Sequence, residues 1–349
     1  MGTGKLANMI YKLLGVAVLL CSFAGAWLAM DYKQYVVSPL PIGDQAYRHV
    51  IIPGTSLKRF TADLHQAGIL THPFYFGLMA RLAGDSQAIK AGEYLFDPGL
   101  TPRQLLEKVV SGAVIQHTFT VVEGWTFSQL LEALRNDNVI VHTLDGLSAE
   151  QIMERLGYPD QQAEGRFMPD TYHFPRGTTD LAFLRRAYQT MMTRLQDEWE
   201  QRDVGLPYQT PYDALIMASI IEKETALPEE RSEIAGVFVR RLERKMRLQT
   251  DPTVIYGLGE QFDGNLKRKD LVMDSPYNTY MHAGLPPTPI ALPGLASLHA
   301  ALHPAPGDAV YFVARGDGSH EFSASLEAHN KAVRRYQLHE RHQAFDGAK

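Results

Sequence analysis

One carboxylate at the end of an apolar helical segment is the residue of this chain best suited to acid catalysis. Nearly every side chain from Ala214 to Ile221 is apolar, and Glu222 follows directly. With helical spacing, Glu222 shares a face with Leu215, Ala218 and Ser219, at i−7, i−4 and i−3. Apolar surroundings favour the protonated form of a carboxyl group, which is a common way to keep a proton donor at neutral pH. Glu222 is therefore the candidate general acid.

A second carboxylate, Glu224, follows two positions later, but it is not expected to act together with Glu222. Two residues along a helix turn the side chain by about 200°, so the two carboxylates point in different directions. A paired-carboxylate glycosidase site is therefore not encoded within this helix. The structural alternative for Glu222 is a helix-end salt bridge with Lys223 or Arg231, since structural ion pairs also involve buried acids.

The elements that must position this acid are a capped helix and two later loops. Thr210 followed by Pro211 and an acid at Asp213 predicts a helix start, with a cap residue, proline in the first turn and a capping-box partner. The segments 248–257 and 274–280 are rich in short polar side chains and tyrosines, and show neither helical nor strand periodicity. Such loops often carry function, so we expect them to form the walls of a cleft over Glu222.

An apolar segment near the N-terminus predicts a membrane anchor. Residues 13–30 contain no charge, and counted from Met9 the segment reaches the ~20 residues that a bilayer core requires. Because Lys5 and Lys12 precede it, residues 1–8 are expected to be cytoplasmic, residues 9–30 to span a membrane once, and the rest to lie outside the cytoplasm. A cleaved signal peptide is the alternative, since Ala24–Ala26 offers a small-residue cleavage site. The net charge of −5 disfavours nucleic acid as a partner.

The remaining chain predicts an α+β protein with two parts after a spacer at residues 31–48. The first part, residues 49–118, has the order strand, helix, helix, strand, helix, with a Pro-Gly turn and capped helices. These elements are expected at residues 50–52, 57–67, 73–82, 92–96 and 102–110. Residues 49–97 resemble a LysM-like module, a small fold associated with N-acetylglucosamine polymers. The second part, residues 119–340, contains the candidate acid and ends in a hairpin with strands at 309–313 and 320–322, followed by a helix from Ser325.

A loop at residues 164–175 interrupts the helical pattern of the second part with aromatic residues and two prolines. Its rings can stack on sugars, or they can fix the loop in the core. The 13 histidines show no spacing typical of a metal site, and neither a His-Glu-x-x-His motif nor a glycine-rich phosphate loop is present. We therefore expect no metal and no cofactor.

Five motifs, in this order, resemble the YceG-like family, the endolytic murein transglycosylases of MltG type. They occupy residues 218–225, 247–257, 275–280, 284–290 and 317–322. The likeness extends from the anchor to about Val333. The resemblance implies a single-pass inner-membrane protein whose periplasmic part, a LysM-like subdomain and a mixed α+β catalytic domain, cleaves nascent peptidoglycan strands near the peptidoglycan synthases. It also implies termination of growing strands, and it assigns the catalytic acid to Glu222.

Motif membership and loop character give further candidates for contacts with substrate. We expect six residues to orient the glycan or to stabilise positive charge in an oxocarbenium-like transition state: Ser219, Thr250, Asp251, Tyr256, Asn278 and Tyr280. The resemblance implies cleavage between N-acetylmuramic acid and N-acetylglucosamine with a 1,6-anhydro product, for which one carboxylate suffices because the C6 hydroxyl of the sugar is the nucleophile. A muramidase that uses Asp251 as second carboxylate, and a glycan-binding scaffold without activity, are the alternatives.

Overall fold

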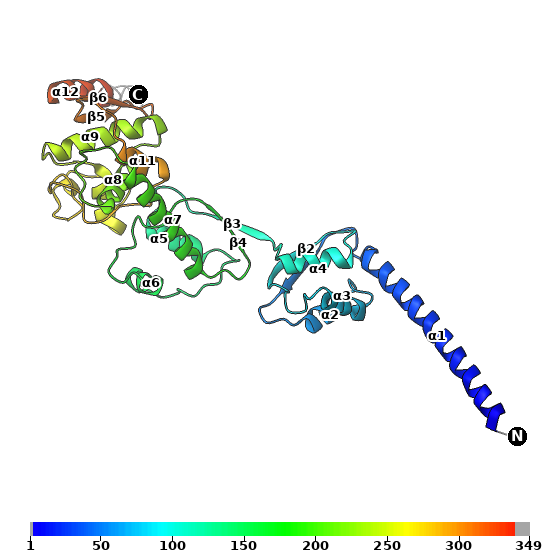
Figure 1. The fold of residues 1–349 in the computed structure, drawn as a ribbon. Helices are drawn as coiled ribbons and strands as arrows, with labels where there is room; N and C mark the ends of the chain where they lie inside the picture. Colours follow the sequence, from blue (N-terminus) through cyan, green and yellow to red (C-terminus); the bar gives the residue numbers. More distant parts are fainter. Residues whose placement is uncertain (1–2, 339–349) are drawn as a thin grey trace, which may run out of the picture. The chain divides into compact units, whose positions relative to one another are not determined.

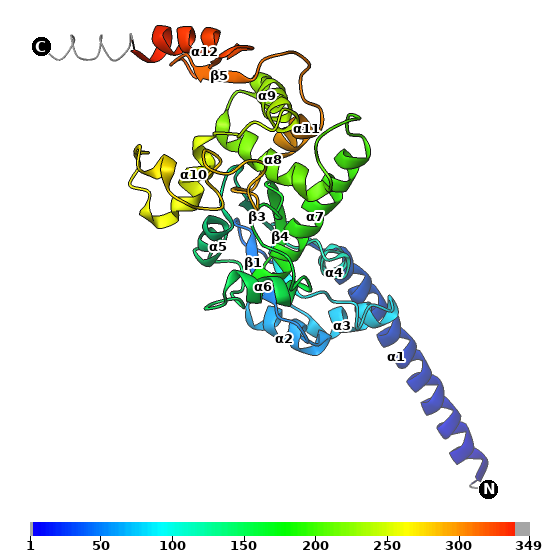
Figure 2. The ribbon, with the colours of Figure 1, turned by 90° about the vertical axis from the view of Figure 1, so that its left-hand side faces the viewer.

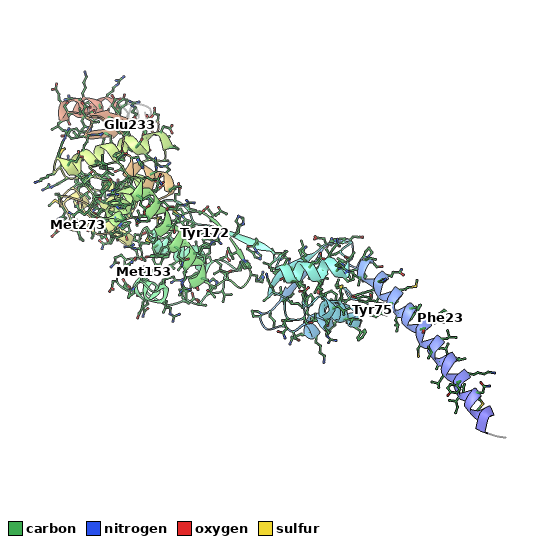
Figure 3. All side chains as sticks on the ribbon, in the orientation of Figure 1. Phe23, Tyr75, Met153, Tyr172, Glu233 and Met273 are labelled. Atoms are coloured by element: carbon green, nitrogen blue, oxygen red, sulfur yellow. The ribbon has the colours of Figure 1, made fainter. Side chains whose placement is uncertain are left out.

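The structure is a computed structural model, and it describes residues 3–338 of the chain (Figure 1). It begins with the long helix α1 (Thr3–Val37). The most apolar 18-residue window of this helix has a mean hydropathy of 2.2, and among the described residues this is the one helix that is long and apolar enough to cross a membrane. Phe23 illustrates its exposed apolar surface, because the side chain projects from α1 with no other element beside it (Figure 3). The helix fits single-pass membrane anchoring.

The end of α1 differs from the prediction. A spacer was expected from residue 31, but the helix continues to Val37 and its last turns enter a hydrophobic core. Tyr35 and Val36 are buried there, together with Leu40 and Ile42 from the extended segment that follows. This segment combines a helical turn with extended chain, so its apolar residues follow neither the helical nor the strand period. The sequence pattern therefore did not reveal that these residues belong to the hydrophobic core.

The chain forms two compact units, of which the first contains residues 1–117 and 174–177. Its β-strands pair antiparallel, with Tyr47 opposite Phe96 and Ile51 opposite Gly92. Fully buried aromatic side chains, among them Phe60 and Tyr94, fill the space between strands and helices. The elements are β1 (Tyr47–Ile51), α2 (Leu57–Gln66), α3 (Pro73–Leu82), β2 (Gly92–Phe96) and α4 (Pro102–Ser111). The predicted element order is confirmed, and the LysM-like assignment stays a prediction.

The second unit contains residues 118–173 and the chain from residue 178. The chain passes between the units in two strands that pair with each other, β3 (Gln116–Thr120) and β4 (Thr171–Pro175). The helices of this part are α5 (Phe127–Arg135), α6 (Ala149–Leu156), α7 (Asp180–Glu200), α8 (Pro211–Glu224), α9 (Arg231–Glu243), α10 (Asp251–Leu258), α11 (Leu295–Leu302) and α12 (Leu326–Val333). Short 3-10 turns lie at Pro228–Glu230, Gly259–Gln261 and Asp270–Val272, and a π-helical turn at Arg334–Leu338. The predicted end of the catalytic region at residue 340 lies outside the described residues.

Helix α8 is the centre of the second unit. It begins as predicted, with the Thr210 hydroxyl accepting from the Asp213 amide and the Asp213 side chain accepting in return from the Thr210 amide. Every residue from Ala214 to Ile221 is buried, because α7, α9, α10 and α11 all pack against this helix. Figure 2 shows α8 beside α9 and α11 at the middle of this unit. Burial on all sides fixes the direction of the residues at its C-terminal end.

Two loop predictions are changed by the structure. Residues 251–258 form helix α10, where no helix was expected; Thr250 occupies the N-cap position and Pro252 the first turn, which is a helix start signal in a segment without helical periodicity. The loop at 164–175 contains strand β4, and its Phe167, Met168 and Tyr172 are buried. Phe167 stacks on Phe127 with ring centroids 4.9 Å apart. These contacts fit the structural role of the aromatic loop.

The C-terminal hairpin is confirmed. Strands β5 (Tyr311–Ala314) and β6 (His320–Ser323) pair antiparallel, with Tyr311 opposite Ser323 and Ala314 opposite His320. Helix α12 follows, and its N-cap residue Ser325 accepts a hydrogen bond from the Ala328 amide. The hairpin and α12 pack together and form one wall of the cavity described next.

Candidate active site

A cavity of about 470 Å³ lies in the second unit, between the end of α8, the residues before α10 and the C-terminal hairpin. Six of its polar lining residues can take part in acid–base chemistry or hold a polar ligand. They are Glu224, Arg241, Thr250, Asp251, Tyr280 and His320. A concave site with several convergent polar groups is the usual form of a site for a small or polymeric ligand. Glu222 is not among the residues that line this cavity.

Glu224 is one of two acids that line this cavity, the other being Asp251. Glu224 is the last residue of α8, and its Oε1 accepts a hydrogen bond from the Thr250 hydroxyl. Burial raises the pKa of Glu224 to about 7, the Thr250 hydrogen bond acts in the opposite direction, and the charge of Asp251 adds to the increase. The raised pKa favours the protonated form of the carboxyl group, which a residue that first gives and then takes a proton requires at the start of the reaction.

Thr250 is held firmly beside this acid. Its amide donates to the Thr279 hydroxyl at 3.1 Å, and its carbonyl accepts from the Thr253 hydroxyl at 2.8 Å. Although Thr250 is at the N-cap position of α10, its side chain makes no cap hydrogen bond, because the hydroxyl turns to Glu224. The preceding Gln249 has a φ of 51°, in the left-handed region that non-glycine residues rarely adopt. Strain of this kind is often found at functional sites.

Asp251 and Tyr280 form a second polar group in the cavity. The Tyr280 hydroxyl donates to Asp251 Oδ1 at 2.6 Å, and the Tyr280 amide donates to Asn278 Oδ1 at 3.0 Å. Burial, and then the contact with Asp251, raise the pKa of Tyr280 well above its usual range. The phenol thus stays protonated and remains a donor, and Asp251 is held on the same side of the cavity as Thr250.

Arg241 and His320 supply the positive side of the cavity. Arg241 is buried, and its guanidinium donates to the carbonyls of Val310 at 2.6 Å and of Leu248 at 2.7 Å, joining the hairpin to the segment before α10. His320 Nδ1 lies 2.7 Å from Glu230 Oε2, and the His320 amide donates to Glu230 Oε1. Both side chains act on Glu224 through charge, which favours its ionised form against burial.

Glu222 lies in different surroundings. Its Oε2 accepts from the Gly294 amide at 2.9 Å, and its Oε1 lies 3.9 Å from Arg231 Nη2, which is also 3.9 Å from Glu123 Oε2. The Glu222 side chain is 7% exposed. The expectation of mostly apolar surroundings was wrong, because segments distant in sequence bring a cation, an amide and a second acid to this face of α8. The structural alternative, a salt bridge to Arg231, is present.

Three further predicted substrate contacts serve the fold in this structure. Ser219 is buried, donates to the Ile216 carbonyl at 2.7 Å and accepts from the Ile290 amide at 3.0 Å. Asn278 is buried and donates to the Met273 carbonyl at 2.8 Å. The structure does not place Ser219, Asn278 or Tyr256 in the cavity wall.

Of the seven residues expected at the site, the structure brings Thr250, Asp251 and Tyr280 together. The same cavity is lined by Glu224, Arg241 and His320, which are not among the seven expected residues. The sequence did contain a signal for Glu224, because this residue belongs to the same motif as Glu222. Since the two acids stand on opposite faces of the helix, only one of them can face a given site. Arg241 belongs to none of the motifs and carried no such signal.

Comparison with known proteins gives a consistent result. The model of the YceG-like family matches residues 50–335. An endolytic murein transglycosylase of Bacillus subtilis is 32% identical over 336 residues, which cover 89% of this chain and 90% of the relative. An endolytic murein transglycosylase of Streptococcus pneumoniae D39 is 26% identical over 89% of this chain, which spans 62% of that longer relative.

Among solved structures, the crystal structure of the yceG-like protein lmo1499 from Listeria monocytogenes is similar to this one. The two share 29% sequence identity with a TM-score of 0.50, over 83% of this chain and 99% of the other. The family match covers most of the chain, both units included, and the element with the Glu222 and Glu224 motif lies within it. The chain therefore belongs to the YceG-like family.

Proposed function

We propose that this protein is an endolytic murein transglycosylase in which Glu224, and not Glu222, is the catalytic acid and base. The activity rests on family membership and on the relatives of that name. One observation carries the residue assignment: Glu224 lines the cavity with a raised pKa, whereas Glu222 is bound by the Gly294 amide next to Arg231. A catalytic acid must reach the substrate, and Glu222 has its carboxylate engaged elsewhere.

The proposed reaction needs one carboxyl group. Protonated Glu224 gives its proton to the glycosidic oxygen between N-acetylmuramic acid and N-acetylglucosamine as the bond from C1 to that oxygen breaks. The resulting carboxylate then accepts the proton of the C6 hydroxyl, and the C6 oxygen bonds to C1. The products are a free N-acetylglucosamine end and a 1,6-anhydro-N-acetylmuramic acid end. No water is consumed, so atoms balance without a second carboxylate.

The neighbours of Glu224 have separate roles in this proposal. Thr250 holds the carboxyl group in one orientation through its hydroxyl. Asp251, held by the Tyr280 hydroxyl, supplies negative charge near the developing oxocarbenium ion. Arg241 and His320 keep the pKa of Glu224 from rising further, which lets the residue act as base in the second half of the reaction. These assignments follow from the shared cavity.

A muramidase is the second candidate, and the position of Asp251 favours it specifically. Asp251 lines the same cavity as Glu224, so two carboxylates are available, as hydrolysis requires. Mass spectrometry of the products of uncrosslinked glycan decides between the two, because a hydrolytic product is one water, about 18 Da, heavier than the anhydro sugar. Products that lack the anhydro end, in wild type, would exclude the transglycosylase chemistry.

The same experiment tests the non-catalytic alternative. A glycan-binding scaffold retains purified strands without shortening them, whereas an endolytic enzyme produces fragments of intermediate length from the start. Wild type, Glu224→Gln and Glu222→Gln should be compared side by side. The proposal expects anhydro-ended fragments from wild type and from Glu222→Gln, and none from Glu224→Gln.

We further propose a cellular setting for this activity. Helix α1 anchors the protein in the inner membrane once, with the N-terminus cytoplasmic and both units in the periplasm. The LysM-like first unit holds glycan, and cleavage near the synthases terminates nascent strands. A reporter enzyme that is active only outside the cytoplasm, fused to the C-terminus, tests the topology: an inactive but stable fusion would overturn it.

A further inference from the structure

A cluster of metal-binding side chains lies outside the Glu224 cavity. We propose that Glu198, His299 and His303 bind a divalent transition metal ion of the Zn²⁺ class. One potential donor atom from each of the three residues lies within 4.8 Å of the other two. Glu198 belongs to the last turn of α7, and the two histidines to the C-terminal end of α11, which packs against α7. Nothing in the transglycosylase proposal uses these residues.

The arrangement follows from helix geometry. His299 and His303 are four residues apart, so their imidazoles stand on one face of the chain, with ring centroids 4.3 Å apart. Packing of α11 on α7 adds the carboxylate, and His299 Nδ1 lies 2.8 Å from Glu198 Oε2. Zinc–ligand bonds of about 2.0–2.1 Å in a tetrahedral site place donor atoms about 3.4 Å apart. The three donors are close enough to reach that spacing by side-chain adjustment alone.

Accessibility agrees with metal entry. The His299 side chain is 60% exposed, and those of His303 and Glu198 are 25% and 19% exposed. An ion can reach the three donors from solvent, because His299 is the most exposed of the three. The partly buried Glu198 and His303 provide a fixed base for the site.

A second carboxylate supports the metal-binding form of His303. Its Nδ1 lies 3.1 Å from Asp203 Oδ1, and because a carboxylate only accepts, Nδ1 carries the hydrogen and Nε2 is left as a lone-pair donor. Ligand histidines in metal sites usually donate their other ring nitrogen to such a carboxylate, which fixes the tautomer and raises the basicity of the ligand. Asp203 is itself held, because its amide donates to the Leu302 carbonyl at 3.0 Å.

The donor types select the metal class. Two imidazoles and one carboxylate suit Zn²⁺, Co²⁺, Ni²⁺ or Cu²⁺, whereas Mg²⁺ and Ca²⁺ prefer oxygen ligands. A bound ion would join the end of α7 to α11, which also packs on α8. Because the unfolded chain does not hold the three donors together, the ion stabilises the native state. The spacing of the histidines did not reveal this site in the sequence, because the third ligand, Glu198, lies 101 residues before His299 in the chain.

Zinc binding to the full-length, detergent-solubilised protein without a histidine tag tests the proposal. Equilibrium dialysis against Zn²⁺ should give one ion per chain for wild type. Glu198→Gln, His299→Ala and His303→Ala should each weaken binding at least tenfold, and Asp203→Asn about tenfold. The matched control is His282→Ala, because His282 forms a single pair with Asp274 at 3.0 Å. It should bind Zn²⁺ as wild type does.

Thermal unfolding gives a second readout that does not depend on enzymatic activity. Zn²⁺ at a concentration that saturates wild type should raise the Tm of wild type and of His282→Ala, and should raise the Tm of His299→Ala and His303→Ala by less. Both variants alter exposed or partly exposed side chains, and their metal-free Tm shows whether they fold. Absence of stoichiometric Zn²⁺ binding to wild type, or equal binding by all variants, would overturn the site.

Discussion

Two carboxyl groups of the second unit, Glu224 and Glu164, have a pKa raised to about 7, and in both cases burial is the main cause. Glu164 has both oxygens bound, because Oε1 accepts from the Phe127 amide at 2.9 Å and Oε2 accepts from the Tyr256 hydroxyl at 3.1 Å. Glu224 accepts from Thr250 at Oε1, while its Oε2 accepts no hydrogen bond from the residues that the structure describes. Only Glu224 lines the cavity with Thr250 and Asp251.

The difference separates two uses of a buried acid. Glu164 binds the first free amide of α5, where a helix N-terminus has unsatisfied donors, so its position explains its burial in structural terms. Glu224 is the last residue of its helix and lines a cavity, and one of its oxygens accepts no hydrogen bond from the described residues. A raised pKa thus reports burial in both places, whereas access to ligand distinguishes the catalytic candidate.

The largest expected effect is a difference in enzymatic activity between variants of Glu224 and of Glu164. Glu224→Gln should lower the rate of formation of anhydro-ended fragments by about 10³-fold or more, because the proton donor and acceptor is lost. Glu164→Gln should lower it by less than about tenfold, since glutamine can still accept from the Phe127 amide. Rates on purified glycan strands check this. Equal losses in the two variants would remove the distinction.

The second prediction concerns stability as a function of pH, where the two acids should behave alike. Because both pKa values are raised from 4.5 to about 7, the native state binds more protons than the unfolded state between these values. The free energy of unfolding should therefore fall as pH rises from about 4.5 to above 7, by about 1–3 kcal/mol per group.

Glutamine substitution at either acid should remove its share of this decrease. Denaturant unfolding of wild type, Glu164→Gln and Glu224→Gln at pH 5 and pH 8 measures it. Each variant should lose less stability than wild type between the two conditions. A variant with the full wild-type slope would show that its acid is ionised in the native state well below pH 7.

The third prediction returns to Glu222. Glu222→Gln should cost about 1 kcal/mol of stability, because the interaction with Arg231 is lost while the amide oxygen can still accept from Gly294. Activity should stay within about tenfold of wild type. A loss as large as that of Glu224→Gln, in a variant with an unchanged Tm, would return the catalytic role to Glu222.

The smallest expected effect is a shift in the pH dependence of activity. A general acid must be protonated, so activity should decline as pH rises through about 7. Thr250→Val removes the hydrogen bond that favours the ionised form of Glu224, and the declining limb should move to higher pH by less than about one unit. The pH profile of kcat/KM checks the direction, and a shift to lower pH would contradict the role of Thr250.

The sequence was sufficient for elements whose signals are local. Thr210 and Asp213 predicted the start of α8, and the hairpin before Ser325 was recognised from alternation and its turn. It was insufficient to decide between Glu222 and Glu224. Helix α8 is apolar on nearly all sides, so it has no polar face that indicates where a cavity lies. The decision depends on residues such as Arg231 and Thr250, which folding brings from other segments.

The unbroken course of α1 into the first core has a mechanical consequence. The helix has 35 residues, so it is about 50 Å long, whereas a bilayer core is about 30 Å thick. Its last turns carry Tyr35 and Val36 into the packed interior of the first unit. Because a continuous helix that ends inside a domain core is stiff, its tilt and rotation in the membrane determine the orientation of that domain as well as its position. A membrane that holds this helix would keep the first unit at a fixed height above the lipid surface, whereas a flexible linker would let that height vary.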